Sequence, residues 1–488
     1  MERLGADEVR DRAASGAALL TARGALILVL GVGANIGLAR LLAPRDFGIL
    51  AIGMALVMVG GYLADGGLGK ALIQRPAPPD RAELAAVNAL QLALTAGLVL
   101  ATTAAGALVG EDGLVVAAMV ASLPITVLRA PSVIVLERRL RYRVIATTDV
   151  VEAVVFYLWA LGAVAAGLGT WGLASAVVAR ALAGTAVILR GGPVGLVAPR
   201  WSWRRVRPLV GFGLSFQAAA AVGLARDQGL NLSIAAIAGV TTLGVWNLAW
   251  RVLQVPLTLF RSLGRVAFPA MANLLGAGED PRRAIERGVA ATTVATGLLL
   301  VGIVGFAPAL PALVGDDWGD VPEAILWSSL ALVVAAPVHA VIAGYLYAAG
   351  QAGAVLRATV LQSIGWLAAA LPLLPSLGPQ AAGIGWAVGS IAQVIPLAAL
   401  AARLSGAAIA REAAAPIAAA VVAAAAGWAV ASAGGRTLAD GILGLATGEL
   451  LLLALLAVVR RSALRDIFRL VSRVLSEAGR PPRPANSA

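Results

Sequence analysis

Long apolar runs alternate along this chain with short segments rich in charge, proline or glycine. A run of about 20 apolar residues is long enough to cross a bilayer as a helix. Such runs predict spanning helices at 17–42, 46–69, 83–108, 113–136, 144–167, 170–189, 209–239, 243–270, 287–309, 322–349, 356–375, 379–402, 412–432 and 438–459. The connecting segments leave no room for an extramembrane domain. The pattern therefore predicts an all-α polytopic membrane protein with about fourteen spans.

Composition supports this class and excludes several others. Apolar residues make up 60% of the 488 positions and charged residues 13%, against about 25% charged in ordinary globular domains. A chain without cysteine and with a single histidine has no disulfide framework, thiolate metal site or multi-histidine metal site. We therefore expect no metal and no cofactor.

The basic residues indicate the orientation of the chain. Of the 38 Lys and Arg residues, 28 fall in ends and loops on one side of the predicted spans and two, Arg45 and Arg436, on the other. Cytoplasmic loops carry such an excess, so both termini are predicted to be cytoplasmic. Because the cations punctuate apolar spans instead of clustering on a soluble face, no nucleic-acid partner is expected.

A short internal repeat suggests two halves. Residues 45–50 (Arg-Asp-Phe-Gly-Ile-Leu), between the first two spans, resemble residues 241–246 (Thr-Thr-Leu-Gly-Val-Trp), between the seventh and eighth. Six spans separate the copies, so both halves would have the same orientation. Parallel repeats of this kind predict two lobes related by an axis along the membrane normal.

Four segments resemble one family, the polysaccharide and lipid-linked oligosaccharide flippases of the MOP exporter superfamily. Residues 38–48 (LARLLAPRDFG) and 63–75 (LADGGLGKALIQR) are similar to that family's motifs around its second span. Residues 136–143, after the fourth span, and 243–269, in the eighth, are similar more loosely, with Trp246 where the family usually has tyrosine.

The resemblance implies an alternating-access fold in which twelve helices enclose a central cavity and two more are peripheral. A cytoplasmic N-terminal segment (1–16) would precede an N-lobe (17–208) and a C-lobe (209–410). A peripheral pair of helices (411–460) and a cytoplasmic amphipathic helix with a disordered tail (461–488) would follow. Arginines of the last segment alternate with apolar residues at helical spacing, which suits an anionic membrane surface.

Charged residues inside the predicted spans are the candidate site. Each costs about 2.5–3.5 kcal/mol on insertion scales, so each requires a partner or a function. The candidates for substrate binding or gating are Arg226, Asp227, Arg180, Arg251, Arg23 and Asp65. Guanidinium groups bind phosphates bidentately, so a cationic cavity would suit a diphosphate. The structural alternative is that these residues form ion pairs between helices. Asp149 and Glu152, at the inner end of the fifth predicted span, are interpreted as partners of the basic segment from Arg138 to Arg143. No catalytic residue is assigned.

These features favour a transporter over an enzyme. The predicted function is the flipping of polyprenyl-diphosphate-linked oligosaccharide across the bacterial plasma membrane, with membrane lipids, a glycan polymerase and glycosyltransferases as partners. A multidrug exporter or another lipid exporter of the same superfamily is the alternative, although the buried charge is cationic and aromatic residues are only 5%. A membrane glycosyltransferase or ligase would need an external catalytic acid, and only the short loops at Asp46 and 316–320 offer one.

Overall fold

The computed structural model describes residues 6–459, and their side chains from residue 23 onward except at 216, 219–220, 259–266, 339–340 and 459. Every regular element in this described part is a helix, as the all-α prediction requires. Ten stretches are long and apolar enough to cross a membrane, or eleven if one bent pair counts as a single span. That number covers only the described residues, so fourteen spans stays a prediction. The predicted amphipathic helix after residue 460 lies outside them.

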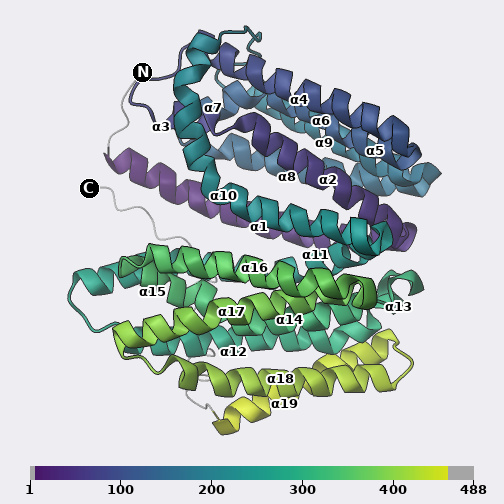
Figure 1. Cartoon of the computed structure of the whole chain (residues 1–488), viewed down its shortest axis with the longest axis vertical. Coiled ribbons are helices and arrows are strands. Elements are labelled where there is room, and N and C mark those ends of the chain that lie inside the picture. The colour runs from purple at the N-terminus through teal and green to yellow at the C-terminus, as the bar shows by residue number, and fades with distance from the viewer. Residues whose placement is uncertain (1–5, 460–488) are drawn as a thin grey trace, which may run out of the picture. The chain divides into compact units, whose positions relative to one another are not determined.

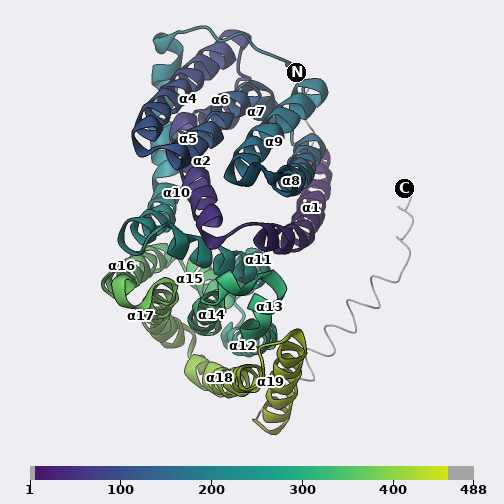
Figure 2. The ribbon, with the colours of Figure 1, turned by 90° about the vertical axis from the view of Figure 1, so that its right-hand side faces the viewer.

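One of the ten stretches, Tyr142–Gly191, contains two helices. A single helix of 50 residues would be far longer than the roughly 30 Å hydrocarbon layer, at about 1.5 Å per residue. The chain turns back at Gly167, whose φ of 88° is a conformation that glycine adopts without strain. The two helices then pack along each other, as Figure 2 shows. They occupy the predicted spans 144–167 and 170–189.

The first compact unit comprises residues 1–247, and most of its helices run side by side (Figure 1). Its elements are α1 (Ala6–Leu41), α2 (Pro44–Asp65), α3 (Leu68–Gln74), α4 (Arg81–Val109), α5 (Glu111–Val120), α6 (Ser122–Val127), α7 (Ala130–Arg138), α8 (Tyr142–Ala163), the π-turn η1 (Val164–Leu168), α9 (Gly169–Gly191) and α10 (Trp203–Ala238). This unit includes α10, which the sequence analysis assigns to the start of the C-lobe at 209–410.

Two breaks interrupt the helices of this unit. The predicted span 113–136 is bent by 53° between Val127 and Ala130, next to Pro131 in the first turn of α7. Proline has no N–H to donate and favours such a helix start. The second break follows Asp65, where Gly66 and Gly67 both have positive φ and end α2. Arg129 and Asp65, one at each break, line the same cavity.

The second compact unit comprises residues 248–488, and α11 (Val240–Gly276) continues into it from the first. Its further described elements are α12 (Arg282–Phe306), η2 (Ala307–Ala309), α13 (Leu310–Val314), η3 (Asp316–Trp318), α14 (Val321–Pro337), the π-turn η4 (Val338–Ile342), α15 (Ala343–Ala348), α16 (Ala352–Leu377), α17 (Pro379–Ser405), α18 (Ile409–Ala433) and α19 (Leu438–Val459). The predicted span 322–349 is divided among α14, η4 and α15.

The two copies of the sequence repeat contact each other in the first unit. Gly48, near the start of α2, lies against the carbonyl oxygen of Val240. Gly244, near the start of α11, lies against the backbone of Pro44 and of Gly48. A Cβ atom at either glycine would overlap backbone atoms that cannot easily move. The glycine shared by the two copies is thus required by this close backbone contact.

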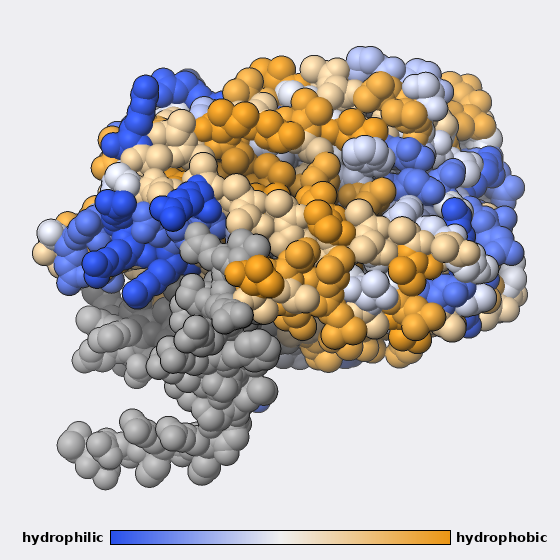
Figure 3. All heavy atoms as spheres, turned by 90° about the horizontal axis from the view of Figure 1, so that it is seen from below, coloured by the Kyte–Doolittle hydropathy of each residue, from blue (hydrophilic) through white to orange (hydrophobic). Residues whose placement is uncertain are grey.

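Helices α18 and α19 pack together and on α12 of the second unit through small residues. Gly305, Gly427 and Gly444 approach so closely that a Cβ at any of them would meet a neighbouring backbone. Small residues allow such close contact between membrane helices. On the face shown in Figure 3, apolar residues form a broad band and hydrophilic residues gather toward its two ends. Such a surface suits a bilayer, and the protein is a multi-pass membrane protein.

Candidate functional site

Arg226 and Asp227 lie together in the second half of α10. The Arg226 guanidinium bonds the Asp227 carboxylate at 2.8 Å, and the two side chains are 20% and 42% exposed. Further along the helix, Asn231 donates to Gln228 at 3.2 Å. A row of polar and charged side chains inside a membrane helix is tolerated where it borders protein or a water-filled path. Substrate binding or gating by this part of α10 stays a prediction.

Three ion pairs join helices of the first unit. Arg23 of α1 binds Asp149 of α8 at 2.5 Å, and Lys70 of α3 binds Glu137 of α7 at 2.6 Å. Arg129, at the bend before α7, binds Glu152 of α8. These pairs join helices that are distant in the sequence. In each pair the positive charge is neutralised by a carboxylate of another helix.

The interpretation that Asp149 and Glu152 pair with Arg138–Arg143 is wrong. Their partners are Arg23 and Arg129, which lie deeper in the predicted spans. Arg138 instead donates to four backbone carbonyls at the end of α3, those of Leu72, Ile73, Arg75 and Pro76. It satisfies helix-end carbonyl groups that would otherwise lack donors.

A cavity of about 360 Å³ opens among these pairs. Its polar and charged lining residues are Asp65, Lys70, Thr126, Arg129, Glu137, Thr148 and Asp149. Among the described residues, no group of three or more His, Asp or Glu side chains could hold a metal ion. The cavity is therefore lined by both carboxylate and cationic side chains.

Asp65 connects this cavity with α10. Its carboxylate accepts hydrogen bonds from the Nε2 atoms of Gln217 at 3.0 Å and Gln91 at 3.4 Å. The Tyr62 hydroxyl donates to the Gln217 carbonyl oxygen at 2.5 Å. One turn earlier on α10, the backbone of Gly213 lies directly against Gly67. Asp65 therefore fastens α10 to the end of α2.

Asp65→Ala is expected to loosen α10 from α2, because the Gln91 and Gln217 amides lose a charged acceptor. Hydrogen bonds to charged groups contribute about 1.5–3 kcal/mol each, so opening of α10 should become at least about tenfold more frequent. The chain has no cysteine, so a single cysteine at Leu209, which is buried beside α3, can report this opening. Its rate of modification by a maleimide should rise about tenfold. Asp440→Ala, at the start of α19 in the other unit, is the control and should leave the rate unchanged.

The other two predicted arginines have separate surroundings. Arg180 of α9 lies inside the first unit, with its guanidinium 5.5 Å from the centre of the Phe156 ring and 3.9 Å from the sulfur of Met54. Arg251 belongs to α11 in the second unit, next to Trp250. The Trp250 ring lies 5.1 Å from that of Trp386. Their roles in transport stay predictions.

Sequence reasoning overlooked one membrane acid. Glu449 lies in the middle of α19, half-buried, with its carboxylate against Gly302 of α12. Apart from Asp440 in its first turn, Glu449 is the single acid of this 22-residue apolar helix, which was a sufficient signal to find it.

Comparison with known proteins identifies the family. The profile of a family described as polysaccharide biosynthesis protein matches residues 37–323, which is more than half of the chain. The chain belongs to the polysaccharide biosynthesis protein family. The match includes Asp65, Arg180, Arg226, Asp227 and Arg251, whereas Arg23 precedes it.

The chain also resembles individual transporters. It is 24% identical over 314 residues to "Succinoglycan biosynthesis transport protein ExoT" of Rhizobium meliloti (strain 1021), an alignment that covers 61% of this chain and 60% of ExoT. Its fold matches the lipid II flippase MurJ in an inward closed conformation, with a TM-score of 0.69 and 11% identity. That match covers 91% of this chain and 99% of MurJ.

An inward-facing multidrug resistance transporter of the MATE family, in the MOP superfamily, matches less closely. The TM-score is 0.57 and the identity 16%, over 78% of this chain and 95% of the transporter. At such identities the two structural likenesses concern the fold alone. The relatives named here are transporters and flippases, and none is named as an enzyme.

Proposed function

We propose that this protein flips a polyprenyl-diphosphate-linked oligosaccharide across the bacterial plasma membrane by alternating access. Membership of the polysaccharide biosynthesis protein family supports the cargo class. The observation that carries the proposal is the membrane-embedded Arg226, held beside Asp227 on a polar stretch of α10. Both termini are cytoplasmic in this proposal, and the glycan polymerase and glycosyltransferases of the same pathway are the expected partners.

Arg226 binds the diphosphate in this mechanism. A guanidinium group presents a planar fork of donors that matches two phosphate oxygens. Asp227 holds the arginine when no anion is present and gives it up when the diphosphate arrives, so that binding stays reversible.

The charged residues of the first unit act differently. Arg23 and Arg180 position helices through Asp149 and Phe156, respectively, and Asp65 gates by fastening α10. The N-lobe can then move as one body while α10 changes its contacts. Rigid-body movement of one repeat against the other is the usual basis of alternating access.

Deleting the gene tests the cargo. We expect one polyprenyl-linked oligosaccharide to accumulate on the inner leaflet while a surface polysaccharide disappears, as measured by mass spectrometry of extracted lipid-linked glycans. Complementation with the intact gene should restore both. Unchanged lipid-linked pools together with increased drug sensitivity would instead favour a multidrug exporter, whose fold this protein also shares.

A further inference from the structure

The segment between α9 and α10 is fixed to the first unit although it has no regular secondary structure. The amide of Asn88 on α4 donates to the Val197 carbonyl at 3.2 Å, and the Arg200 N–H donates to the Ala85 carbonyl at 3.2 Å. Ser132 of α7 donates to the Gly195 carbonyl at 3.3 Å. The Val197 side chain is buried. We refer to residues 190–207, this segment with the adjoining helix ends, as the connector.

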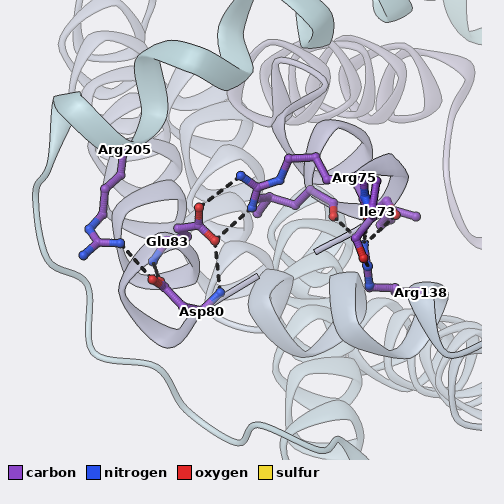
Figure 4. A network of polar contacts seen from close by, with 8 residues as sticks. Ile73, Arg75, Asp80, Glu83, Arg138 and Arg205 are labelled. Carbon is purple, nitrogen blue, oxygen red and sulfur yellow. Dashed lines mark hydrogen bonds and ion pairs between the residues drawn. The ribbon is translucent and has the colours of Figure 1, made fainter. Parts of the chain in front are cut away.

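A polar network fixes the end of the connector at α10 (Figure 4). Arg205 binds Asp80 at 2.9 Å, and Asp80 caps α4 by accepting from the Glu83 N–H at 2.6 Å. Glu83 in turn binds Arg75 at 2.8 and 3.1 Å. The Glu83 N–H, followed by the Arg205 guanidinium, lowers the pKa of Asp80 below its usual value. Asp80 is therefore ionised at neutral pH and forms an ion pair with Arg205.

The outer surface of the connector combines large apolar side chains with arginine. Leu196, Trp201 and Trp203 are 58%, 63% and 51% exposed. The arginines at 190, 200, 204 and 207 are exposed as well. The sequence has no acidic residue between Glu152 and Asp227 to balance them. The connector is thus a rigid cationic surface with two protruding indoles.

We propose that the connector binds anionic phospholipid headgroups. It lies where α9 ends and where α4 and α10 begin, which is the level at which spanning helices leave the bilayer. Tryptophan favours the headgroup region, and arginine forms charge-assisted bonds with phosphate. Bound lipid would hold the first turn of α10, the helix that carries Arg226. A lipid therefore fits the connector better than an acidic protein, which would leave the indoles without an apolar environment.

The test measures lipid binding to the purified full-length protein in detergent by native mass spectrometry. The probes are phosphatidylglycerol and phosphatidylcholine with identical acyl chains. The test variant carries Arg200→Gln, Arg204→Gln and Arg207→Gln, and leaves Arg205 in place because it binds Asp80. A second variant carries lysine at the same three positions. The matched control carries Arg283→Gln, Arg287→Gln and Arg357→Gln, three exposed arginines of the second unit.

We expect the unaltered protein to retain phosphatidylglycerol more strongly than phosphatidylcholine. The triple glutamine variant should lose at least about tenfold in phosphatidylglycerol affinity, since each basic residue near an anionic surface contributes roughly fivefold. The lysine variant and the second-unit control should retain most of the affinity, and 0.5 M salt should weaken it. Retention by the lysine variant also shows that replacing these three arginines does not by itself unfold the connector.

Three results would overturn the proposal. The glutamine variant could bind phosphatidylglycerol as well as the unaltered protein, or the second-unit control could lose as much affinity. Displacement of the lipid by an equal concentration of inorganic phosphate would show that the connector takes free anions instead of a membrane lipid.

Discussion

Arg226→Ala is expected to abolish export of the lipid-linked glycan while leaving the protein folded and inserted. Alanine removes the group that binds the diphosphate, and truncating one partner of a desolvated, charge-paired contact usually costs 2–5 kcal/mol or more in binding. That loss corresponds to at least about a thirtyfold weaker complex. The measurement is flipping of a fluorescent polyprenyl-diphosphate glycan in proteoliposomes, together with accumulation of the natural lipid in cells.

Two further variants separate charge from structure. Arg226→Lys keeps the charge but loses the bidentate geometry, so we expect partial activity. Arg357→Ala removes an exposed arginine of the second unit and should leave flipping unchanged. Thermal unfolding of Arg226→Ala should occur at nearly the temperature of the unaltered protein. Normal flipping by Arg226→Ala would remove this arginine from the proposed site.

The spanning pattern could be predicted from the sequence because burial in a bilayer requires apolar runs of a fixed length. The helices at 44–65, 81–109 and 352–377 follow predicted spans within a few residues. A break of the helix inside an apolar run leaves the run apolar, so the hydrophobic pattern does not reveal it. Val127 and Ala130 flank a 53° bend in a segment that reads as one continuous span.

Partners of the charged residues were less predictable. Asp149 and Glu152 are near the basic run 138–143 in sequence, yet they bind Arg23 and Arg129. Sequence distance is a poor guide once helices from different parts of the chain pack together. The short match between 45–50 and 241–246 predicts two parallel halves. The structure adds that the two segments lie in contact, because the glycine in each is needed for close backbone approach.

The second large effect is expected for Glu152→Gln in the interior of the first unit. Glu152 binds Arg129, with the two side chains 20% and 15% exposed, and it also interacts with Arg180. Breaking a buried ion pair by neutralising one partner leaves an uncompensated charge and costs about 3–5 kcal/mol. We therefore expect a large fall in the unfolding temperature and in the yield of inserted protein, measured by thermal unfolding in detergent.

Glu152→Gln leaves two cations, Arg129 and Arg180, without the carboxylate that balances them. The double variant Arg129→Gln/Glu152→Gln removes one of these cations and should be more stable than Glu152→Gln alone. The exposed pair Arg45–Asp112 provides the comparison, and Asp112→Asn should cost less than about 1 kcal/mol. Gly184 lies beside both Glu152 and Arg129, so that a Cβ there would displace them. Gly184→Ala should therefore reproduce part of the loss without changing any charge. If Glu152→Gln were as stable as Asp112→Asn, the Arg129–Glu152 pair would not be a support of the fold.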